Sequence, residues 1–502
     1  MLRRTALAAT ALLAAGALFL SGCTGSQPAP SGSAGTPDPD ATVNVRLVLE
    51  PGNLDIRETA GSALDQILID NVYQGLVSRT PDQKIVPALA SDYEVSADKL
   101  TYTFTLREGV TFHDGQPLTP QDVVWSLTQV RDTATYRDSA RLANVSGIAA
   151  DGQKITLTLK APDSTLLWSL TGRAGLILKE GDKVDRKTAA NGTGPFRLAD
   201  WREGDSIVFE RFADYWGTAS SAAEVVFSYV SDNQAALSGA LAGEFDVLTG
   251  FDANLKDQVE ANGDFSLDIG DSTDKGTLAF NQASGPLADK RVRKAIRQAI
   301  DKTAIVEALG AGKTMYGPIP SLDPGYEDLS KVAPFDPEAA RNLLSEAGAK
   351  NLSLTLTIPS AYGTTIPQIL VSNLRDVGIT LKVNPVEFPT WVNDVYVNKD
   401  YQLSFVLHTE ARDFENWANP DYYFTYDNPE VQKLYAEAVA ATDDAAAADL
   451  LKEAARIVSE DDAADWLYNG QSVLAVASDV SGMPTVNVNE RLNVAELAKS
   501  EG

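Results

Sequence analysis

The chain has 502 residues, which is more than a single hydrophobic core usually holds. Its hydrophobic fraction of 44% excludes wholesale disorder. Its 42 Lys and Arg residues stand against 69 Asp and Glu residues, a formal net charge of −27, which disfavours nucleic acid as a partner and close contact with an anionic membrane surface. We therefore expect two or three lobes with an acidic, solubilising surface and only a mild preference for cationic ligands.

The N-terminus has the features of a secretory lipoprotein signal. A basic start precedes an apolar run, and Leu20 to Cys23 match the bacterial lipobox. Residues 1–22 are therefore predicted to be a signal peptide, and Cys23, the only cysteine of the chain, to carry a lipid, which leaves no internal disulfide. Residues 23–41 are rich in Ser, Gly and Pro and are predicted to be a flexible tether, so that the lipid alone holds the protein on the outer face of the cell membrane.

The pattern of apolar and polar residues in the first third of the chain predicts several strands and helices. Leu100 to Leu106 alternates apolar residues with threonines, which is typical of a half-buried strand, and a second short extended piece is expected at 110–112. Thr119 followed by Pro120, with Asp122 in the first turn, predicts the start of a helix. The other elements expected here are strands at 43–49 and 155–160 and a helix at 63–76.

Strands alternate with helices in the second half, which indicates an α/β fold with a parallel-rich sheet. Apolar residues at helical spacing run through 287–309, where Asp301 is placed to cap the second of two helices and Gly310 to end it. The other elements expected here are strands at 207–212, 244–248, 352–358, 379–386 and 403–407, and helices at 233–241, 336–348, 364–377, 428–440 and 445–458. Residues 466–477 are expected to cross back to the first lobe.

Two groups of titratable residues have simple structural interpretations. A basic cluster is expected to be a solvated helix face rather than an anion site: Arg291, Arg293, Lys294 and Arg297. His113 lies in a turn and is expected to make a structural hydrogen bond. His408 lies near the binding segment described below, but one histidine without cysteine partners is weak evidence for a metal site, so no metal or cofactor is expected.

Three blocks of the sequence resemble one known family. Residues 85–127 read IVPALASDYEVSADKLTYTFTLREGVTFHDGQPLTPQDVVWSL, residues 191–216 contain GTGPF and end in YW, and residues 277–309 contain PLADKRVRKAIRQAID. These blocks are similar to the signature regions of the extracytoplasmic solute-binding proteins of family 5, which serve peptide and nickel ABC importers.

The resemblance implies an α/β, two-lobed periplasmic-binding-protein-like fold of class II, in the large cluster with an extra subdomain, and a ligand cleft between the lobes. Lobe I would comprise residues 42–58, 188–276 and 470–502, an accessory subdomain residues 59–187, and lobe II residues 277–469. The partners implied are a peptide or other small solute and the transmembrane subunits of an ABC permease, and the protein is expected to act as a monomer.

The segment 407–424, LHTEARDFENWANPDYYF, has the most unusual composition of the second half and follows a predicted strand. Ligands of open α/β folds bind where strands end. A carboxylate, a guanidinium and aromatic rings suit a zwitterionic peptide, so the candidate ligand-binding residues here are Glu410, Arg412, Asp413, Asn416 and Trp417. The resemblance implies that an aspartate near the position of Asn416 holds the peptide ammonium. Because Asn416 is not an acid, either Asp413 or Glu410 takes over this role or the ligand lacks a free amine. Alternatively, Arg412 and Asp413 pair only to fix the loop.

We interpret the chain as a lipid-anchored substrate-binding protein of an ABC importer that captures a di- or oligopeptide. A nickel chelate, haem or an oligosaccharide are alternative cargoes. A secreted hydrolase is a remote alternative, because the sequence has two histidines in total and neither a G-x-S-x-G nor an H-E-x-x-H motif. Weaker candidates for ligand contact are Phe251, Asn281, Trp391 and Tyr468.

Overall fold

The computed structural model describes residues 36–501, except residues 60, 262, 284 and 490. The predicted signal peptide and Cys23 lie outside the described residues. In the described part of the chain, no helix has the length and hydrophobicity needed to cross a membrane.

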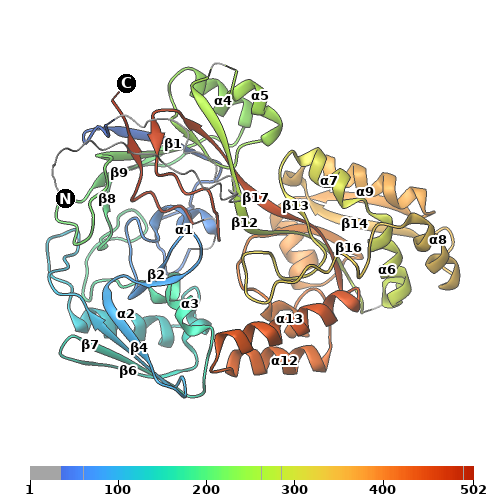
Figure 1. The fold of residues 1–502 in the computed structure, drawn as a ribbon, viewed down its shortest axis with the longest axis horizontal. Helices are drawn as coiled ribbons and strands as arrows, with labels where there is room; N and C mark the ends of the chain where they lie inside the picture. Colours follow the sequence, from blue (N-terminus) through green and yellow to red (C-terminus); the bar gives the residue numbers. More distant parts are fainter. Residues whose placement is uncertain (1–35, 60, 262, 284, 490, 502) are drawn as a thin grey trace, which may run out of the picture. The chain divides into compact units, whose positions relative to one another are not determined.

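A mixed sheet is the largest element, with eleven strands within the described residues (Figure 1). Its strands follow the order β15-β14-β16-β12-β17-β11-β1-β10-β9-β8, and β13 pairs with β17. The strands are β1 Thr42–Leu47, β8 Phe196–Arg202, β9 Ser206–Arg211, β10 Glu224–Tyr229, β11 Val247–Leu248, β12 Phe265–Phe280, β13 Lys313–Thr314, β14 Ser353–Pro359, β15 Thr380–Val386, β16 Leu403–His408 and β17 Ala464–Ala477. Strands β10-β1-β11 and β15-β14-β16 pair in parallel, whereas β12 pairs antiparallel with both β16 and β17.

Strands β12 and β17 are long enough to contribute to several hydrophobic cores. Their pairing is interrupted between Asp271 and Lys275 and again between Gly276 and Thr277. The predicted boundaries of lobes I and II, 276/277 and 469/470, fall inside these two strands, at the irregular part of the ladder.

Alternation along the strands places hydrophobic clusters on both faces of the β14-β16-β12-β17 region. Leu278 and Phe280 of β12 face one cluster, and Ala279 between them faces the other. The first cluster is covered by helices α6 Lys290–Ala299, α7 Lys302–Leu309, α8 Pro337–Glu346 and α9 Thr365–Asp376. The second is covered by α12 Pro429–Ala440 and α13 Asp444–Glu460, together with α10 Phe388–Trp391, the π-helix Val392–Val397 and α11 Glu415–Ala418. Figure 1 shows α7 and α9 on the opposite side of these strands from α12 and α13.

A separate sheet of four strands, in the order β4-β5-β7-β6, forms the centre of the predicted accessory subdomain. Its strands are β4 Ala90–Val95, β5 Thr101–Leu106, β6 Val145–Asp151 and β7 Lys154–Leu159, and helix α2 Pro120–Asp132 packs against it. Tyr102, Phe104 and Leu106 are buried while the threonines between them are half-buried, as the alternation predicts. The remaining strands and α-helices of the described chain are β2 Val77–Arg79, β3 Ile85–Pro87, β18 Val480–Ser481, β19 Ala498–Lys499, α1 Ser62–Leu68, α3 Leu166–Leu170, α4 Asn233–Leu241 and α5 Lys256–Val259.

Two elements of the first third differ from the prediction. The helix expected at 63–76 ends at Leu68, because Asp70 adopts a left-handed backbone conformation with φ 65°. Beyond it the chain runs tightly against α3, and a Cβ on Gly75 would lie 2.9 Å from the carbonyl oxygen of Leu170. The extended piece expected at 110–112 forms no strand and makes only an isolated bridge from Thr111.

The basic cluster on α6 is only partly a solvated face. Arg291 is exposed and pairs with Asp289 at 2.6 Å, as expected of a surface residue. Arg297 is fully buried and lies 2.8 Å from Asp462, and Arg293 is also buried. The prediction is therefore wrong for these two arginines, which helical spacing turns toward the core together with Val292 and Ile296.

His113 makes the structural hydrogen bonds that its turn position predicts. Its Nε2 lies 3.0 Å from the carbonyl oxygen of Gly194, and the backbone N–H of Gly192 donates to its Nδ1 at 3.3 Å. Burial lowers the pKa of His113 to about 4, so its ring is neutral at physiological pH.

Candidate functional site

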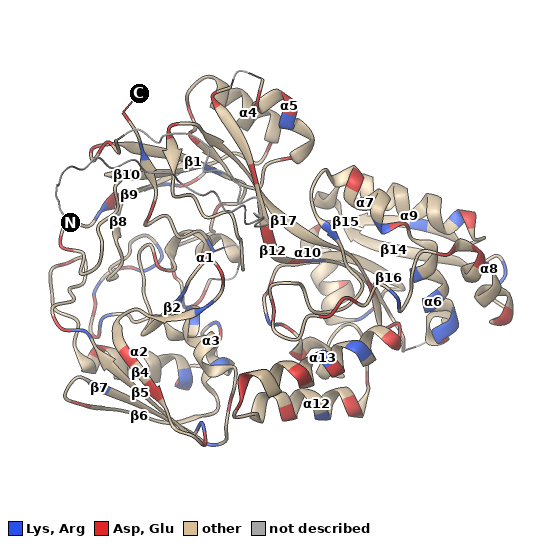
Figure 2. Ribbon diagram, viewed as in Figure 1, with Lys and Arg blue, Asp and Glu red and all other residues tan. Residues whose placement is uncertain are grey.

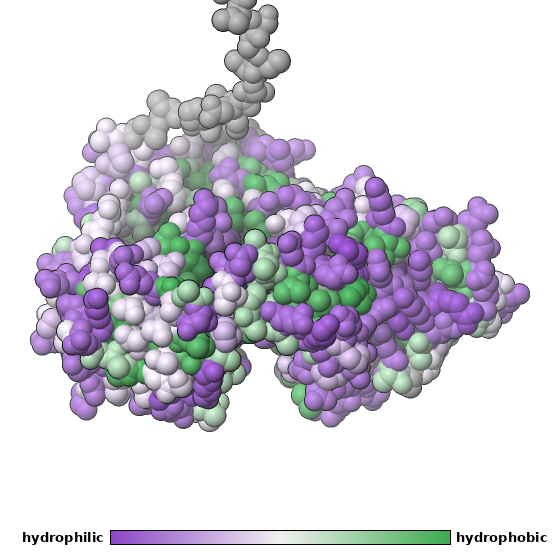
Figure 3. Space-filling view, turned by 60° about the horizontal axis from the view of Figure 1, so that its bottom comes forward, coloured by the Kyte–Doolittle hydropathy of each residue, from purple (hydrophilic) through white to green (hydrophobic). Residues whose placement is uncertain are grey.

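A cavity of about 680 Å³ is lined by segments that lie far apart in the sequence. One side comes from residues 61–173, and the other from residues 362–435. Its aromatic lining includes Trp168, Tyr396, Phe388, Trp391, Tyr422 and Tyr435. In Figure 3, hydrophobic residues form several separate patches among hydrophilic ones on the displayed face. A cavity of this size and mixed lining is typical of a site for a small ligand.

The loop that follows β16 enters this cavity. Glu410 and Arg412 both line it, so the charged segment predicted at the end of a strand lies at a cavity. The loop is fixed by two hydrogen bonds from remote residues: the backbone N–H of Ala411 donates to Asn489, and that of Arg412 to Asp323, both at 2.6 Å. Arg412 itself has a φ of 54°, a strained conformation for a residue with a side chain, and these two bonds hold it there.

Two guanidinium groups lie over the same indole ring. The Cζ atom of Arg412 is 3.8 Å from the ring centroid of Trp168, and that of Arg79 is 4.4 Å away. Burial lowers the pKa of Arg79 to about 10 and also lowers the pKa of Arg412, yet both remain protonated at neutral pH. Among the described residues, neither has a carboxylate within ion-pair distance.

Two carboxylates at the cavity, Asp65 and Glu410, differ in whether a protein cation pairs with them. Asp65 pairs with Arg173, and burial raises the pKa of Asp65 to about 6. Glu410 is exposed to the cavity, and the structure gives its side chain no ion pair within the described part of the chain. The Glu410 carboxylate is therefore available to an incoming ammonium group.

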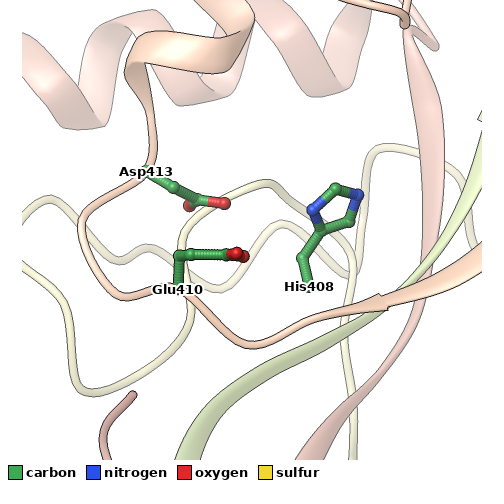
Figure 4. A group of neighbouring side chains, drawn as sticks. All are labelled: His408, Glu410 and Asp413. Carbon is green, nitrogen blue, oxygen red and sulfur yellow. The ribbon is translucent and has the colours of Figure 1, made fainter. Parts of the chain in front are cut away.

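Three side chains near the loop could in principle hold a metal ion. Figure 4 shows His408, Glu410 and Asp413 with their polar ends turned toward one another, and their potential ligand atoms lie within 4.8 Å. A protein cation already occupies part of this arrangement, because Lys275 Nζ lies 3.3 Å from Asp413 and donates to the backbone oxygen of Glu410 at 2.6 Å. Burial lowers the pKa of His408, whose Nε2 lies 2.8 Å from the hydroxyl of Tyr423. A metal ion bound here would therefore have to compete with the Lys275 ammonium for Asp413.

The remaining candidates from the sequence occupy different environments. Trp391 lines the cavity, with its Nε1 donating to Ser404 at 2.8 Å. Trp417 is 3% exposed and stacks on Phe424 with ring centroids 4.1 Å apart, inside a hydrophobic core. Of the others, Phe251 lies in a hydrophobic cluster, Asn281 donates to the carbonyl oxygens of Lys399 and Tyr401, Tyr468 packs against Phe405, and the backbone N–H of Asn416 donates to Asp413. Six of the predicted site residues therefore do not line the described cavity: Phe251, Asn281, Asp413, Asn416, Trp417 and Tyr468.

Sequence reasoning missed the wall contributed by residues 61–173. Arg79 and Trp168 belong to short elements without a motif of their own, β2 and α3. An arginine and a tryptophan in such short segments gave no indication that they meet Arg412, more than 200 residues further along the chain. Only the folded chain brings these residues together.

Most of the sequence is similar to that of known solute-binding proteins. The family described as bacterial extracellular solute-binding proteins, family 5 Middle, matches residues 84–430. The chain is 28% identical to Heme-binding protein A of Haemophilus influenzae, over 93% of this chain and 94% of the relative, and 26% identical to glutathione-binding protein GsiB of Pectobacterium atrosepticum, over 82% and 84%.

The fold is also similar to a solved structure. The ABC transporter-associated periplasmic binding protein DppA of Helicobacter pylori, in complex with the peptide STSA, superposes with a TM-score of 0.78 at 21% sequence identity, covering 92% of this chain and 98% of the other. The predicted two-lobed α/β fold is thereby confirmed. Because the family match spans more than half of the sequence, the chain belongs to the bacterial extracellular solute-binding proteins of family 5 and is an extracytoplasmic substrate-binding protein of an ABC importer rather than an enzyme.

Proposed function

We propose that the cargo is a di- or oligopeptide, which the cavity captures and the protein delivers intact to the transmembrane subunits of an ABC permease. One observation carries this proposal: the same cavity presents a free carboxylate, Glu410, and free guanidinium groups, Arg79 and Arg412, beside aromatic walls. A peptide has an ammonium group at one end, a carboxylate at the other and side chains between them. The names of two similar proteins, one solved with a peptide and one described as glutathione-binding, support the same cargo class.

The assignment of roles follows from charge. Glu410 would accept hydrogen bonds from the peptide ammonium, since its exposed carboxylate has no ion pair within the described chain. Arg412 would bind the terminal carboxylate through its planar fork, which its contact with Trp168 holds in one orientation. Trp391 and the neighbouring Phe388, stacked at an interplanar angle of 9°, would pack against peptide side chains.

Two measurements test this proposal. Native mass spectrometry of protein purified without denaturation identifies any bound cargo by its mass, and we expect a short peptide. In titration calorimetry, Glu410→Gln should weaken the binding of a free-amine peptide about tenfold, whereas Glu430→Gln, an exposed carboxylate paired with Lys433 on α12, should leave it unchanged. A co-purified mass that is no peptide, together with no detectable peptide binding, would contradict the proposal.

A metal-bearing cargo, such as a nickel chelate or haem, is a second candidate. The His408, Glu410 and Asp413 group supports it, because these side chains offer ligand atoms close together beside the cavity. Metal analysis of the same purified sample separates the two candidates: a stoichiometric transition metal favours this cargo, and a metal-free peptide complex rules it out. An oligosaccharide would be recognised by its mass in the same spectrum.

We also propose that a lipid on Cys23 anchors the protein to the outer face of the cell membrane. The lipobox at residues 20–23 and the low-complexity segment after it support this anchor. Cells expressing wild-type protein should hold it in the membrane fraction, and Cys23→Ala should release it in soluble form or leave the signal peptide uncleaved. Equal membrane association of both proteins, with the signal peptide removed from each, would refute the lipid anchor.

A further inference from the structure

The charge of the cavity lining is opposite to that of the whole chain. Across the sequence acidic residues outnumber basic ones, 69 to 42, and Figure 2 shows them distributed over helices and loops in both halves of the picture. The described lining contains five arginines and three carboxylates. The mild preference for cationic ligands expected from the net charge therefore does not extend to this cavity.

Two of the arginines are neutralised by protein carboxylates. Arg173 pairs with Asp65, and Arg141 pairs with Glu415 at 2.8 Å. Of the lining groups left without an ion pair in the described chain, Arg137, Asp138 and Glu410 are exposed, so water screens their charges. The partly buried charges that remain are those of Arg79 and Arg412.

These two guanidinium groups lie over one indole ring, and neither forms an ion pair within the described chain, although the buried carboxylate of Asp323 is near enough to favour the charged form of both. Each raises the cost of the other's charge, and the proximity of Arg412 contributes to the lowered pKa of Arg79. Within the described residues the Nε atom of Arg412 also has no hydrogen-bond partner, so a donor of its fork is unused. Partly buried cations without an ion-pair partner are unfavourable unless a ligand supplies the anions.

We infer that the cargo carries at least two carboxylates, one bound by Arg412 and one by Arg79, with Trp168 holding both guanidinium groups in place. This inference rests on the proposed function and narrows it to acidic peptides, whose second carboxylate is an Asp or Glu side chain. A terminal carboxylate satisfies one planar fork, and the side-chain carboxylate satisfies the other. Neutral and basic peptides would leave one cation unpaired.

A series of peptides of equal length tests this inference by calorimetry on the purified protein. Ala-Ala-Glu should bind at least tenfold more tightly than its neutral isostere Ala-Ala-Gln, and Ala-Ala-Lys should bind most weakly. Arg79→Gln and Arg412→Gln should each reduce the ratio of Glu-peptide to Gln-peptide affinity toward one. Arg375→Gln, an exposed residue on α9 with 71% of its side chain accessible, is the control and should leave that ratio unchanged.

The outcomes separate the inference from the proposed function. Equal affinity of the wild-type protein for the Glu and Gln peptides would overturn the inference and leave a peptide receptor in place. No binding of any peptide would instead overturn the proposed function. The wild-type selectivity needs no substitution, so the test stands even if an arginine variant fails to fold.

Discussion

Arg297 forms a buried ion network that the sequence presented as surface charge. Its guanidinium lies 2.8 Å from Asp462 and 3.4 Å from Asp465, and the latter also pairs with Lys302 at 2.6 Å. All four side chains are almost fully inaccessible to solvent. Removing one partner of such a network leaves an uncompensated charge in the core, which is strongly destabilising.

We therefore predict that Arg297→Met lowers the free energy of unfolding by about 3–5 kcal/mol. Arg291→Met on the same helix is the matched control, because its ion pair with Asp289 is solvent-exposed and should change stability by less than about 1 kcal/mol. Urea denaturation of both variants measures the difference. Equal effects of the two substitutions would show that the buried network contributes no more than a surface pair.

His113 provides a pH-dependent contribution to stability with a definite sign. Its pKa is about 4 in the folded protein and about 6.5 in an unfolded chain, so between these values the unfolded state binds more protons. Stability is therefore fully present above about pH 6.5 and falls by up to about 3 kcal/mol as the pH drops toward 4.

His113→Gln should remove this dependence. The variant should be less stable than wild type at pH 7.5, since the ring bridges Gly192 and Gly194, and the gap should narrow as the pH falls to 4.5. Denaturation of both proteins at several pH values measures the difference between their free energies of unfolding. Carboxylates that titrate in both proteins contribute equally and cancel in this difference. A gap that is independent of pH would contradict the assigned pKa.

At the candidate site, the sequence could identify the loop but not every side chain that turns into the cavity. Charged residues at the end of a predicted strand indicated Glu410 and Arg412 as ligand-binding residues; both line the cavity, and their contact with a ligand stays a prediction. Trp417, from the same segment, packs on Phe424 in the core, because the short helix α11 turns its indole inward. The direction of a side chain in an irregular segment depends on tertiary packing, which composition does not contain.

Among the secondary-structure elements, those with local signals could be predicted closely. Helix α2 begins at Pro120 as expected, because Thr119 and Asp122 form a capping box: the backbone N–H of Asp122 donates to the Thr119 hydroxyl, and that of Thr119 to the Asp122 carboxylate. The end of helix α1 could not be predicted. The helix stops before Asp70, which has a left-handed backbone conformation, and the chain then packs closely against α3 at Gly75, a contact between segments remote in sequence.

The capping box permits a matched comparison between two threonines at helix starts. Thr119→Ala should lower the free energy of unfolding by about 1 kcal/mol, since it removes the acceptor of a helix N–H group. Thr364 precedes α9 but makes no side-chain capping hydrogen bond, so Thr364→Ala should cost only a few tenths of that. Similar losses in thermal and urea unfolding for both variants would show that the capping bond of Thr119 does not contribute.

For the whole molecule, the resemblance of three sequence blocks to a known family predicted the two-lobed α/β fold, whereas the composition of the cavity could not be predicted. The turn residues and alternation within these blocks indicate local strands and turns, and the two-lobed arrangement is what the family resemblance implies. The cavity joins residues 61–173 with residues 362–435, a pairing that no local pattern encodes. The net charge was misleading for the same reason: it averages over the surface, and the lining is a small, selected part of it.

Because the chain as a whole is acidic and two partly buried arginines of the described cavity have no ion pair, we predict that salt raises the unfolding temperature but weakens the binding of an acidic peptide. A net charge of −27 repels itself in the compact state, so raising NaCl from 20 to about 200 mM, which shortens the screening length from roughly 20 Å to less than 10 Å, should raise the unfolding temperature of the empty protein. The same change should weaken the binding of an acidic peptide, because salt screens its attraction to Arg79 and Arg412. Calorimetry at both salt concentrations measures the two effects, with Ala-Ala-Gln as the peptide whose affinity should change least. A fall in unfolding temperature would show that screened ion pairs outweigh the acidic self-repulsion, and salt-independent binding of the acidic peptide would show that the two guanidinium groups exert no net attraction on it.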